Sequence, residues 1–253
     1  MSPQTAEPAT AGFVYWRPAI HGVVELCSLK GREVALPTHF HAEDQFTFVT
    51  AGRRRFLVGG EVVELAAGQS TLIPAGVAHR SLAEPAGVAC FNIYLPAGEY
   101  ALTAILRDVE RLWHDATCAG SCIHPEELAL VAQEHRRTAR EGVPRPESFI
   151  PPDANEIESV AQAAEQAGMT REGFSRMFVR RHGMPPHAFW LMVRLNRARE
   201  LLKAGERIAA AAAETGFADQ SHFGRWFLRA FGVTPGCYRS GLSSRSQTFQ
   251  TRA

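Results

Sequence analysis

Residues 216–239 read GFADQSHFGRWFLRAFGVTPGCYR, and the same order of glycines, aromatic residues and arginines occurs once earlier in the chain, from residue 168 onward. The matched positions are Gly168, Phe174, Arg176, Phe178, Arg180, Gly183, Pro186 and Phe189 in the first copy, and Gly216, Phe223, Arg225, Phe227, Arg229, Gly232, Pro235 and Tyr238 in the second. The offset is 48 at the first glycine and 49 from the phenylalanine onward, so the second copy has one extra residue in its turn. A repeat that matches at so many positions indicates two copies of one structural unit.

Each copy predicts a helix, a tight glycine turn and a second helix. Apolar residues at helical spacing precede each glycine, which can end a helix in the left-handed conformation. Thr170 and Asp219 then stand where a side-chain oxygen can cap the N-terminus of the next helix. The second helix of each copy has phenylalanines four residues apart, the spacing of a buried face. The sequence therefore predicts two helix-turn-helix units, near residues 157–182 and 207–232.

The outward side of each second helix carries polar side chains that can reach base edges in a major groove. These candidate DNA-contacting residues are Arg171, Glu172, Ser175 and Arg176 in the first unit and Gln220, Ser221, His222 and Arg225 in the second. A solvated helix face is the plain alternative for any single helix. Two matched units in one chain favour DNA binding.

Charge and the connecting segment agree with this interpretation. Residues 157–239 carry twelve Lys+Arg against seven Asp+Glu, a net charge of +5, whereas residues 1–156 carry thirteen against nineteen, a net charge of −6. A basic excess attracts phosphates. Residues 186–202 predict one long helix between the units. If both units enter one face of a duplex, this connector must hold them about one helical turn, ~34 Å, apart.

Residues 157–239, above all the stretch 216–239, resemble the DNA-binding domain of AraC/XylS-type transcriptional regulators. The resemblance implies a seven-helix domain with two helix-turn-helix subdomains, acting on double-stranded promoter DNA and, in an activator, on RNA polymerase. By position, the residues that it implies contact bases are Glu172, Ser175, Arg176, Gln220, Ser221 and Arg225. The second copy matches more closely, because Gly173 lies inside the first recognition helix and costs about 1 kcal/mol relative to alanine.

The first half of the chain predicts a different fold. Short apolar or alternating segments, separated by turn residues, occur at 13–17, 22–28, 45–50, 53–58, 61–65, 70–73 and 88–95. Gly59 and Gly60 between two of them indicate a tight hairpin. Several short strands at near-regular spacing favour an all-β barrel or sandwich. The predicted fold class is thus α+β, with an N-terminal β-barrel followed by an all-α domain.

Residues 12–96 resemble the cupin barrel, which commonly supplies the effector domain of AraC-type regulators. The motif positions are His39, His41, Gln45, Gly52, Gly68, Pro74, Gly76 and His79. Two departures from the family pattern are that Gln45 stands where metal-binding cupins usually have glutamate, and that Gly31 is farther from His39 than usual. The resemblance implies a domain that senses a small-molecule effector, and the mouth of a β-barrel is a usual location for such a site.

His39, His41, Gln45 and His79 have two interpretations. Three imidazoles and an amide oxygen can bind a divalent metal, although the amide lacks the negative charge of a carboxylate and binds more weakly. Alternatively, the same four residues line a polar effector pocket or satisfy one another inside the barrel, and no cofactor is required. Other candidates for the barrel interior are Phe46, Phe48, Phe56, Arg53 and Arg55.

Residues 97–124 are predicted to connect the two halves, and residues 125–240 to form the DNA-binding domain. Amphipathic helices are expected over 100–113 and 126–139. They can pack on the barrel, begin the DNA-binding domain or form a homodimer, since helices after the cupin often mediate dimerisation in the resembling family. The proline-rich segment 143–153 is expected to be a mobile connection.

His114, Cys118, Cys122 and His124 match no strong zinc pattern, and ordinary loop residues are the favoured interpretation. The other cysteines are scattered, which is typical of reduced thiols in a cytoplasm. No apolar run reaches the length of a membrane span, and the first residues lack the pattern of a secretory signal. We therefore expect a protein that does not associate with membranes, and the resemblance to AraC/XylS-type regulators implies a prokaryotic cytoplasm.

Together these patterns predict a sequence-specific DNA-binding transcriptional regulator, not an enzyme. One alternative is a metal-dependent cupin enzyme. No acid–base pair or nucleophile is evident, however, and the amide of Gln45 cannot act as a general base. The other alternative is a sequence-indifferent DNA-binding protein, which needs basic charge but not two defined reading helices.

Overall fold

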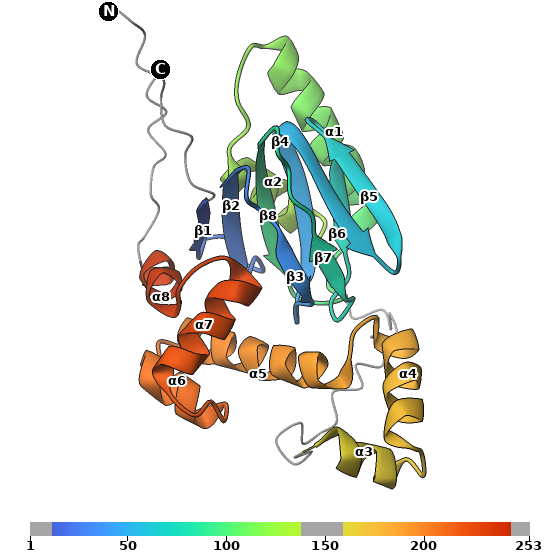
Figure 1. Ribbon diagram of the computed structural model, residues 1–253. Helices are drawn as coiled ribbons and strands as arrows, with labels where there is room; N and C mark the ends of the chain where they lie inside the picture. Colours follow the sequence, from blue (N-terminus) through green and yellow to red (C-terminus); the bar gives the residue numbers. More distant parts are fainter. Residues whose placement is uncertain (1–11, 138–158, 244–253) are drawn as a thin grey trace, which may run out of the picture.

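The computed structural model describes residues 12–137 and 159–243. The first range forms a curled antiparallel sheet with two helices on its outer face, and the second forms a group of helices beneath the sheet (Figure 1). The predicted α+β class, with a barrel-like sheet before an all-α domain, is confirmed. The predicted connection 143–153 lies outside the described residues.

The sheet consists of β1 (Gly12–Trp16), β2 (Glu25–Gly31), β3 (Leu36–His39), β4 (Asp44–Val58), β5 (Glu61–Ala66), β6 (Ser70–Ile73), β7 (His79–Ser81) and β8 (Val88–Leu95). Their order is β1-β2-β8-β4-β7-β3, and β5 and β6 pair with β4. The sequence does not predict β3 and β7, because runs of four and three residues are too short to show alternation.

One long strand, β4, replaces two predicted strands. Its register with β8 shifts between Val49 and Ala51. The part before the shift pairs with β6, and the part after it pairs with β5 and β7. Because such an irregularity bends a strand, β4 contributes to both walls of the curled sheet. The predicted hairpin is confirmed, since Gly59 and Gly60 have φ values of 59° and 91° and form the turn between β4 and β5.

The helices are α1 (Leu102–Cys118), α2 (Pro125–Glu134), α3 (Val160–Gln166), α4 (Arg171–His182), α5 (Pro186–Lys203), α6 (Ile208–Glu214), α7 (Gln220–Phe231) and α8 (Pro235–Ser243). The pairs α3–α4 and α6–α7 are the two predicted helix-turn-helix units, and α5 is the predicted connector. Within the described residues, no helix is long and apolar enough to cross a membrane.

The outer face of the sheet packs against α1 and α2. Phe46 and Phe48 lie there, in one apolar cluster with Leu128 and Ala132 of α2. These two candidates for the barrel interior therefore lie on the outer face instead. The structure also places α2 with the sheet, whereas the sequence assigned residues 125–240 to the DNA-binding domain. The reason is that the buried side of α2 is covered by β8 and α1.

A second apolar cluster continues from the inner face of the sheet into the helical domain. The ring of Phe40 lies 4.9 Å from that of Phe189 in α5, and the ring of Tyr15 lies 5.4 Å from that of Tyr238 in α8. All four side chains are buried in the same cluster. Since burial of apolar surface is the main favourable contribution to folding, the two domains stabilise each other through a shared core.

Candidate DNA-binding surface and ligand cavity

The recognition helices α4 and α7 begin at the caps that the sequence predicts. Thr170 Oγ1 accepts a hydrogen bond from the amide of Gly173 at 3.1 Å, and Asp219 Oδ1 accepts one from the amide of His222 at 2.6 Å. The hydrogen bond from the backbone of His222 lowers the pKa of Asp219, which keeps this cap ionised. Gly173 lies inside a regular helix, so the register of the first recognition helix is intact.

Both recognition helices direct their N-terminal ends away from the sheet. Their C-terminal caps are Gly183 and Gly232, with φ values of 70° and 75°; Gly183 lies against the loop before β7 and Gly232 against β1. A Cβ at Gly183 would lie 3.3 Å from the Cβ of Ala78, and one at Gly232 would lie 2.3 Å from the ring of Phe13. Base contacts come mainly from the N-terminal part of a recognition helix. The N-terminal ends, which would read DNA, are therefore not covered by the sheet (Figure 1).

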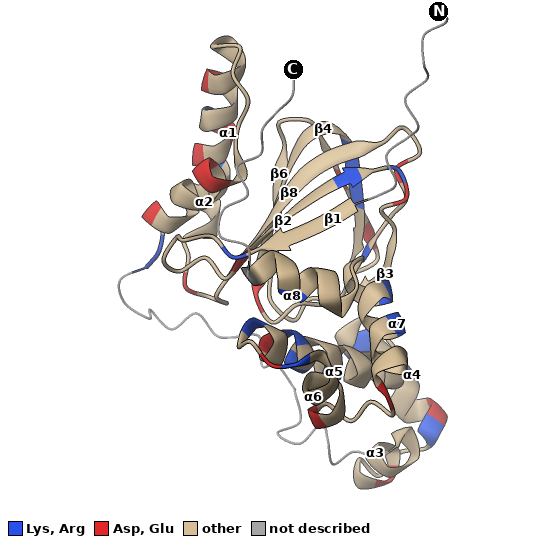
Figure 2. Ribbon diagram, turned by 90° about the vertical axis from the view of Figure 1, so that its left-hand side faces the viewer, with Lys and Arg blue, Asp and Glu red and all other residues tan. Residues whose placement is uncertain are grey.

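The predicted DNA-contacting residues lie on these free parts of the helices. Arg171, Glu172, Arg176, Gln220, Ser221 and Arg225 are exposed, and Ser175 and His222 are half-buried. The His222 ring is restrained, because its Nε2 accepts a hydrogen bond from Trp226 Nε1 at 2.8 Å. Figure 2 shows basic positions on α7 and at the end of α4 next to α3. The surface thus presents donors and acceptors suited to base edges.

The inner side of the sheet gathers three of the four predicted effector or metal residues. His39, His41 and His79 each offer a ligand atom, and these atoms lie within 4.8 Å of one another. Burial lowers the pKa of all three rings, that of His79 to about 4. The imidazoles are consequently neutral near pH 7, the form that binds metals. Across residues 12–137 and 159–243, no second group of His, Cys, Asp or Glu has this arrangement.

Backbone hydrogen bonds orient two of the three rings. His39 Nδ1 lies 2.8 Å from the carbonyl oxygen of Pro37, and His79 Nδ1 lies 3.0 Å from that of Val77. A carbonyl oxygen only accepts, so each Nδ1 carries the proton and each Nε2 keeps a lone pair. His79 Nε2 is buried without a hydrogen-bond partner. It is therefore available as a ligand atom.

Gln45 lies beside this cluster. Its Nε2 donates to Thr47 Oγ1 at 3.0 Å, and that hydroxyl donates to Asn92 Oδ1 at 2.8 Å. These bonds orient the amide and leave Gln45 Oε1 buried without a partner. An unsatisfied buried acceptor costs about 1–3 kcal/mol, so the site favours an occupant that donates to this oxygen or is ligated by it.

Arg54 is a cavity residue that the sequence analysis missed. The cavity, about 10 Å³, is lined by Phe13, Tyr15, Leu36, His39, His41, Gln45, Arg54, Phe56, Ser81, Asn92, Tyr94 and Ala230. Of the five other candidates for the interior, Phe56 lines the cavity, whereas Arg53 and Arg55 form ion pairs with Glu84 on the other side of the strand. Alternation along β4 explains the difference, because Arg54 and Phe56 share one face and Arg53 and Arg55 the opposite face.

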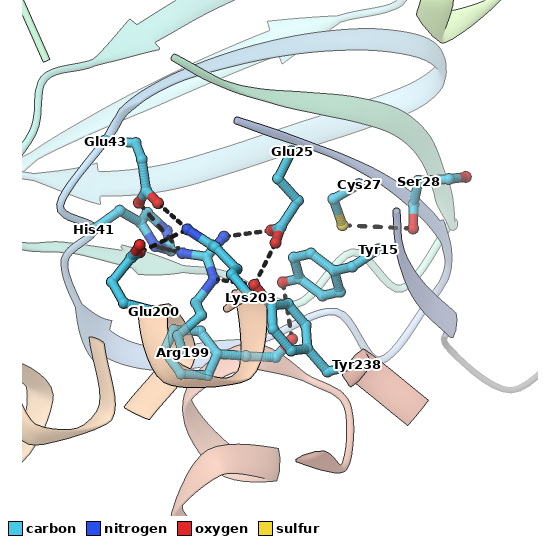
Figure 3. A network of polar contacts seen from close by, with 11 residues as sticks. Tyr15, Glu25, Cys27, Ser28, His41, Glu43, Arg199, Glu200, Lys203 and Tyr238 are labelled. Carbon is cyan, nitrogen blue, oxygen red and sulfur yellow. Dashed lines mark hydrogen bonds and ion pairs between the residues drawn. The ribbon is translucent and has the colours of Figure 1, made fainter. Parts of the chain in front are cut away.

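A buried ionic network joins the sheet to α5 and α8 (Figure 3). Arg199 of α5 forms ion pairs with Glu25 and Glu43, and its Nε donates to the hydroxyl of Tyr238 at 3.0 Å. Lys203 also pairs with Glu43. Burial opposes ionisation of Glu43, but the charges of Arg199 and Lys203 outweigh it and lower its pKa to about 2. The network therefore holds the helical domain against the sheet.

This contact between the sheet and the helical domain, the domain seam, also borders the cavity. Arg199 Nη1 lies 3.4 Å from His41 Nδ1. Ala230 of α7 forms part of the cavity wall. Nearby, Asn196 Nδ2 donates to the carbonyl oxygen of Phe40 at 3.0 Å. The cavity is thus adjacent to both the connector helix and the second recognition helix.

The cysteines and histidines at the end of α1 and before α2 form no comparable site. Cys118 Sγ lies 3.8 Å from His114 Nε2, and Cys118 and Cys122 are exposed free thiols. The backbone amide of His124 instead donates to Glu127 Oε2 at 2.7 Å at the start of α2. These contacts agree with ordinary loop and cap roles.

Comparison with known protein families agrees with this geometry. Residues 163–241 match the family described as a helix-turn-helix domain, and residues 25–88 match the family described as a cupin domain. The chain therefore matches a cupin family in its sheet domain and a helix-turn-helix family in its helical domain.

Two curated relatives are HTH-type transcriptional regulators. The one from Haemophilus influenzae is 36% identical over 85 residues, which are 33% of this chain and 28% of the relative. MtrA from Neisseria gonorrhoeae is 36% identical over 90 residues, 35% of this chain and 29% of the relative. Among solved structures, unsaturated fatty acid bound ToxT from Vibrio cholerae is 12% identical, with a TM-score of 0.48 over 96% of this chain and 100% of that one. The chain spans less than a third of the two curated relatives.

Proposed function

We propose that this protein is a sequence-specific DNA-binding transcriptional regulator whose cupin domain senses a small molecule. The observation that carries the proposal is the orientation of α4 and α7. Their polar N-terminal ends are free, and their C-terminal caps, Gly183 and Gly232, lie against the sheet domain that contains the cavity. The relatives' names, HTH-type transcriptional regulators, support regulation rather than catalysis.

The proposal includes promoter DNA as the partner and a cytoplasmic, prokaryotic setting. It extends to RNA polymerase if the protein activates transcription, and to a second copy of the chain if α1 and α2 form a dimer contact. Catalysis is not part of the proposal, because the amide of Gln45 cannot replace a carboxylate as a general base.

Arg225 provides the test of sequence-specific reading. A duplex selected in vitro from a random pool and a random duplex would be titrated with the full chain, with fluorescence anisotropy as the readout. We expect Arg225→Ala to weaken the selected complex by roughly 1–3 kcal/mol and the random complex much less, because a bidentate arginine–guanine contact is lost.

Arg229→Ala is the matched control, since it removes the same charge one turn closer to the sheet. This variant should weaken both complexes alike through lost phosphate attraction. Equal losses on the two duplexes for Arg225→Ala would instead favour a sequence-indifferent DNA-binding protein. Retained promoter control in an Arg176→Ala, Arg225→Ala double variant would contradict the assigned contact residues.

We also propose that His39, His41 and His79, with Gln45 Oε1, bind a divalent metal ion. The donor set fits, because His79 Nε2 and Gln45 Oε1 are buried without partners and the ligand atoms of the histidines are close together. A bound ion would supply positive charge inside the cavity. Its role would be structural or regulatory.

Metal analysis and thermal denaturation test this proposal. We expect a near-stoichiometric divalent ion in the purified protein and a fall in Tm after chelation, because an ion that binds only the folded state stabilises it. His79→Ala should lose both effects, whereas His114→Ala, an exposed histidine in α1, should keep them. Protein without such an ion, and without a Tm response to added Zn²⁺, Ni²⁺ or Mn²⁺, would refute the metal site.

A further inference from the structure

Arg54 is a buried cation that lacks an anionic partner. It is 2% exposed, and its Nη2 donates to Ser81 Oγ at 2.7 Å, while its Nη1 lies 3.4 Å from the carbonyl oxygens of Val34 and Leu82. Its Nε is buried without a hydrogen-bond partner. In the described part of the chain, none of the ion pairs includes Arg54. A guanidinium stays charged in proteins, and an unpaired buried charge is costly.

The carboxylate of Glu84 acts on the charge of Arg54, but Arg53 and Arg55 already neutralise this carboxylate. Glu84 Oε1 lies 3.2 Å from Arg55 Nε, and Glu84 Oε2 lies 3.8 Å from Arg53 Nε. Burial lowers the pKa of Arg54 in spite of Glu84. The ring of Phe56, 4.8 Å from the guanidinium, compensates the charge only in part. A net positive charge therefore borders the cavity.

We propose that this cavity binds the carboxylate group of a small organic acid, with Arg54 as the residue that binds it. The inference names the ligand class of the sensing function proposed above and rests on that function. The free Nε of Arg54 can donate to one carboxylate oxygen. Phe13, Leu36, Phe56 and Ala230 supply apolar wall for the hydrocarbon part. A single unpaired guanidinium N–H suits the one negative charge of a carboxylate better than a phosphate, which carries more charge and needs more donors.

The size of the cavity connects ligand binding to the DNA-binding domain. A volume of about 10 Å³ is near the lower limit for one water molecule, so an organic acid must displace part of the wall. Most of the wall belongs to strands that are held by ladder hydrogen bonds. Ala230, by contrast, belongs to α7, which is held there by side-chain packing and by the hydrogen bond from Tyr15 to the carbonyl oxygen of Phe231. Binding should therefore shift α7, and with it the end of α7 that reads DNA.

Thermal denaturation of the full chain tests the site without DNA. Formate, acetate and propionate would be compared with formamide, acetamide and propionamide, and with chloride, at constant ionic strength. We expect the carboxylates to raise Tm with concentration, and the amides and chloride to leave it unchanged. Arg54→Gln should abolish the response, and Arg54→Lys should keep a weaker one. Arg53→Gln, on the outer face of the same strand, should respond like the wild type.

Three results would overturn the proposal. They are a chloride response equal to that of acetate, a response of Arg54→Gln equal to that of the wild type, and no response of the wild type to any carboxylate. If Arg54→Gln does not fold, as judged by circular dichroism, Arg54→Lys and Arg53→Gln are compared instead.

A DNA titration with and without propionate is a separate readout. A Tm shift with unchanged DNA affinity would support the carboxylate site while contradicting its coupling to α7.

Discussion

The two arginines buried near the domain seam differ in what surrounds them. Arg199 is 1% exposed, and the charges of Glu25 and Glu43 outweigh burial and raise its pKa well above the ordinary value. Arg54 is 2% exposed, and burial lowers its pKa because no described carboxylate pairs with it. A buried charge is stabilised only by its partners. Arg199 therefore completes a structural contact, whereas Arg54 marks a place for a ligand.

Removal of Arg199 should have the largest effect on stability. Arg199→Met leaves Glu25 and Glu43 buried with fewer partners, so we expect the free energy of unfolding to fall by about 3–5 kcal/mol. Urea denaturation followed by circular dichroism measures this loss. Adding Glu25→Gln to Arg199→Met should recover part of it. A loss below about 1 kcal/mol, the range of exposed pairs, would mean that water reaches the seam and that the contrast with Arg54 is wrong.

A smaller loss is expected for Tyr238→Phe. The Tyr238 hydroxyl accepts from Arg199 and donates to Glu25, and hydrogen bonds to charged groups contribute roughly 1.5–3 kcal/mol. Tyr15→Phe is the matched control, because its hydroxyl donates to the neutral carbonyl oxygen of Phe231 at 3.0 Å and should cost about 1 kcal/mol. Urea denaturation compares the two variants. A greater loss for Tyr15→Phe would show that the ionic network is not the main contact.

The smallest change should follow from Arg54→Met. This substitution removes an unpaired charge together with the hydrogen bond to Ser81, so we expect the free energy of unfolding to stay within about 1 kcal/mol of the wild type. The same urea measurement applies, without added ligand. A loss as large as that of Arg199→Met would show that Arg54 is a structural residue and would remove the distinction between the two arginines.

Local signals explain why the helical domain could be predicted from the sequence. Thr170 and Asp219 cap their helices, and Gly183 and Gly232 end them, through contacts within a few residues. The ionic contact between the sheet and the helical domain has no such local signal in the sequence. Arg199 and Glu25 are 174 residues apart, and nothing near Arg199 in the sequence distinguishes it from Arg194 and Arg197 of the same helix, which are half-buried and exposed.

The candidate site could be predicted only in part for a related reason. The spacing of the histidines shows that they belong together, but the orientation of residues 53–55 depends on the register shift between Val49 and Ala51. Before the shift, Gln45 lines the cavity at an odd position, and after it Arg54 and Phe56 do so at even positions. Because three consecutive arginines follow the shift, alternation alone does not reveal which one faces inward.

The shared aromatic core has a practical consequence for work on fragments. Excision of residues 159–243 would uncover the rings of Phe189 and Tyr238, which Phe40 and Tyr15 cover in the intact chain. Contiguous apolar surface of this kind promotes aggregation. We expect the excised half to be poorly soluble, and its affinity for promoters to be an unreliable guide to that of the whole protein.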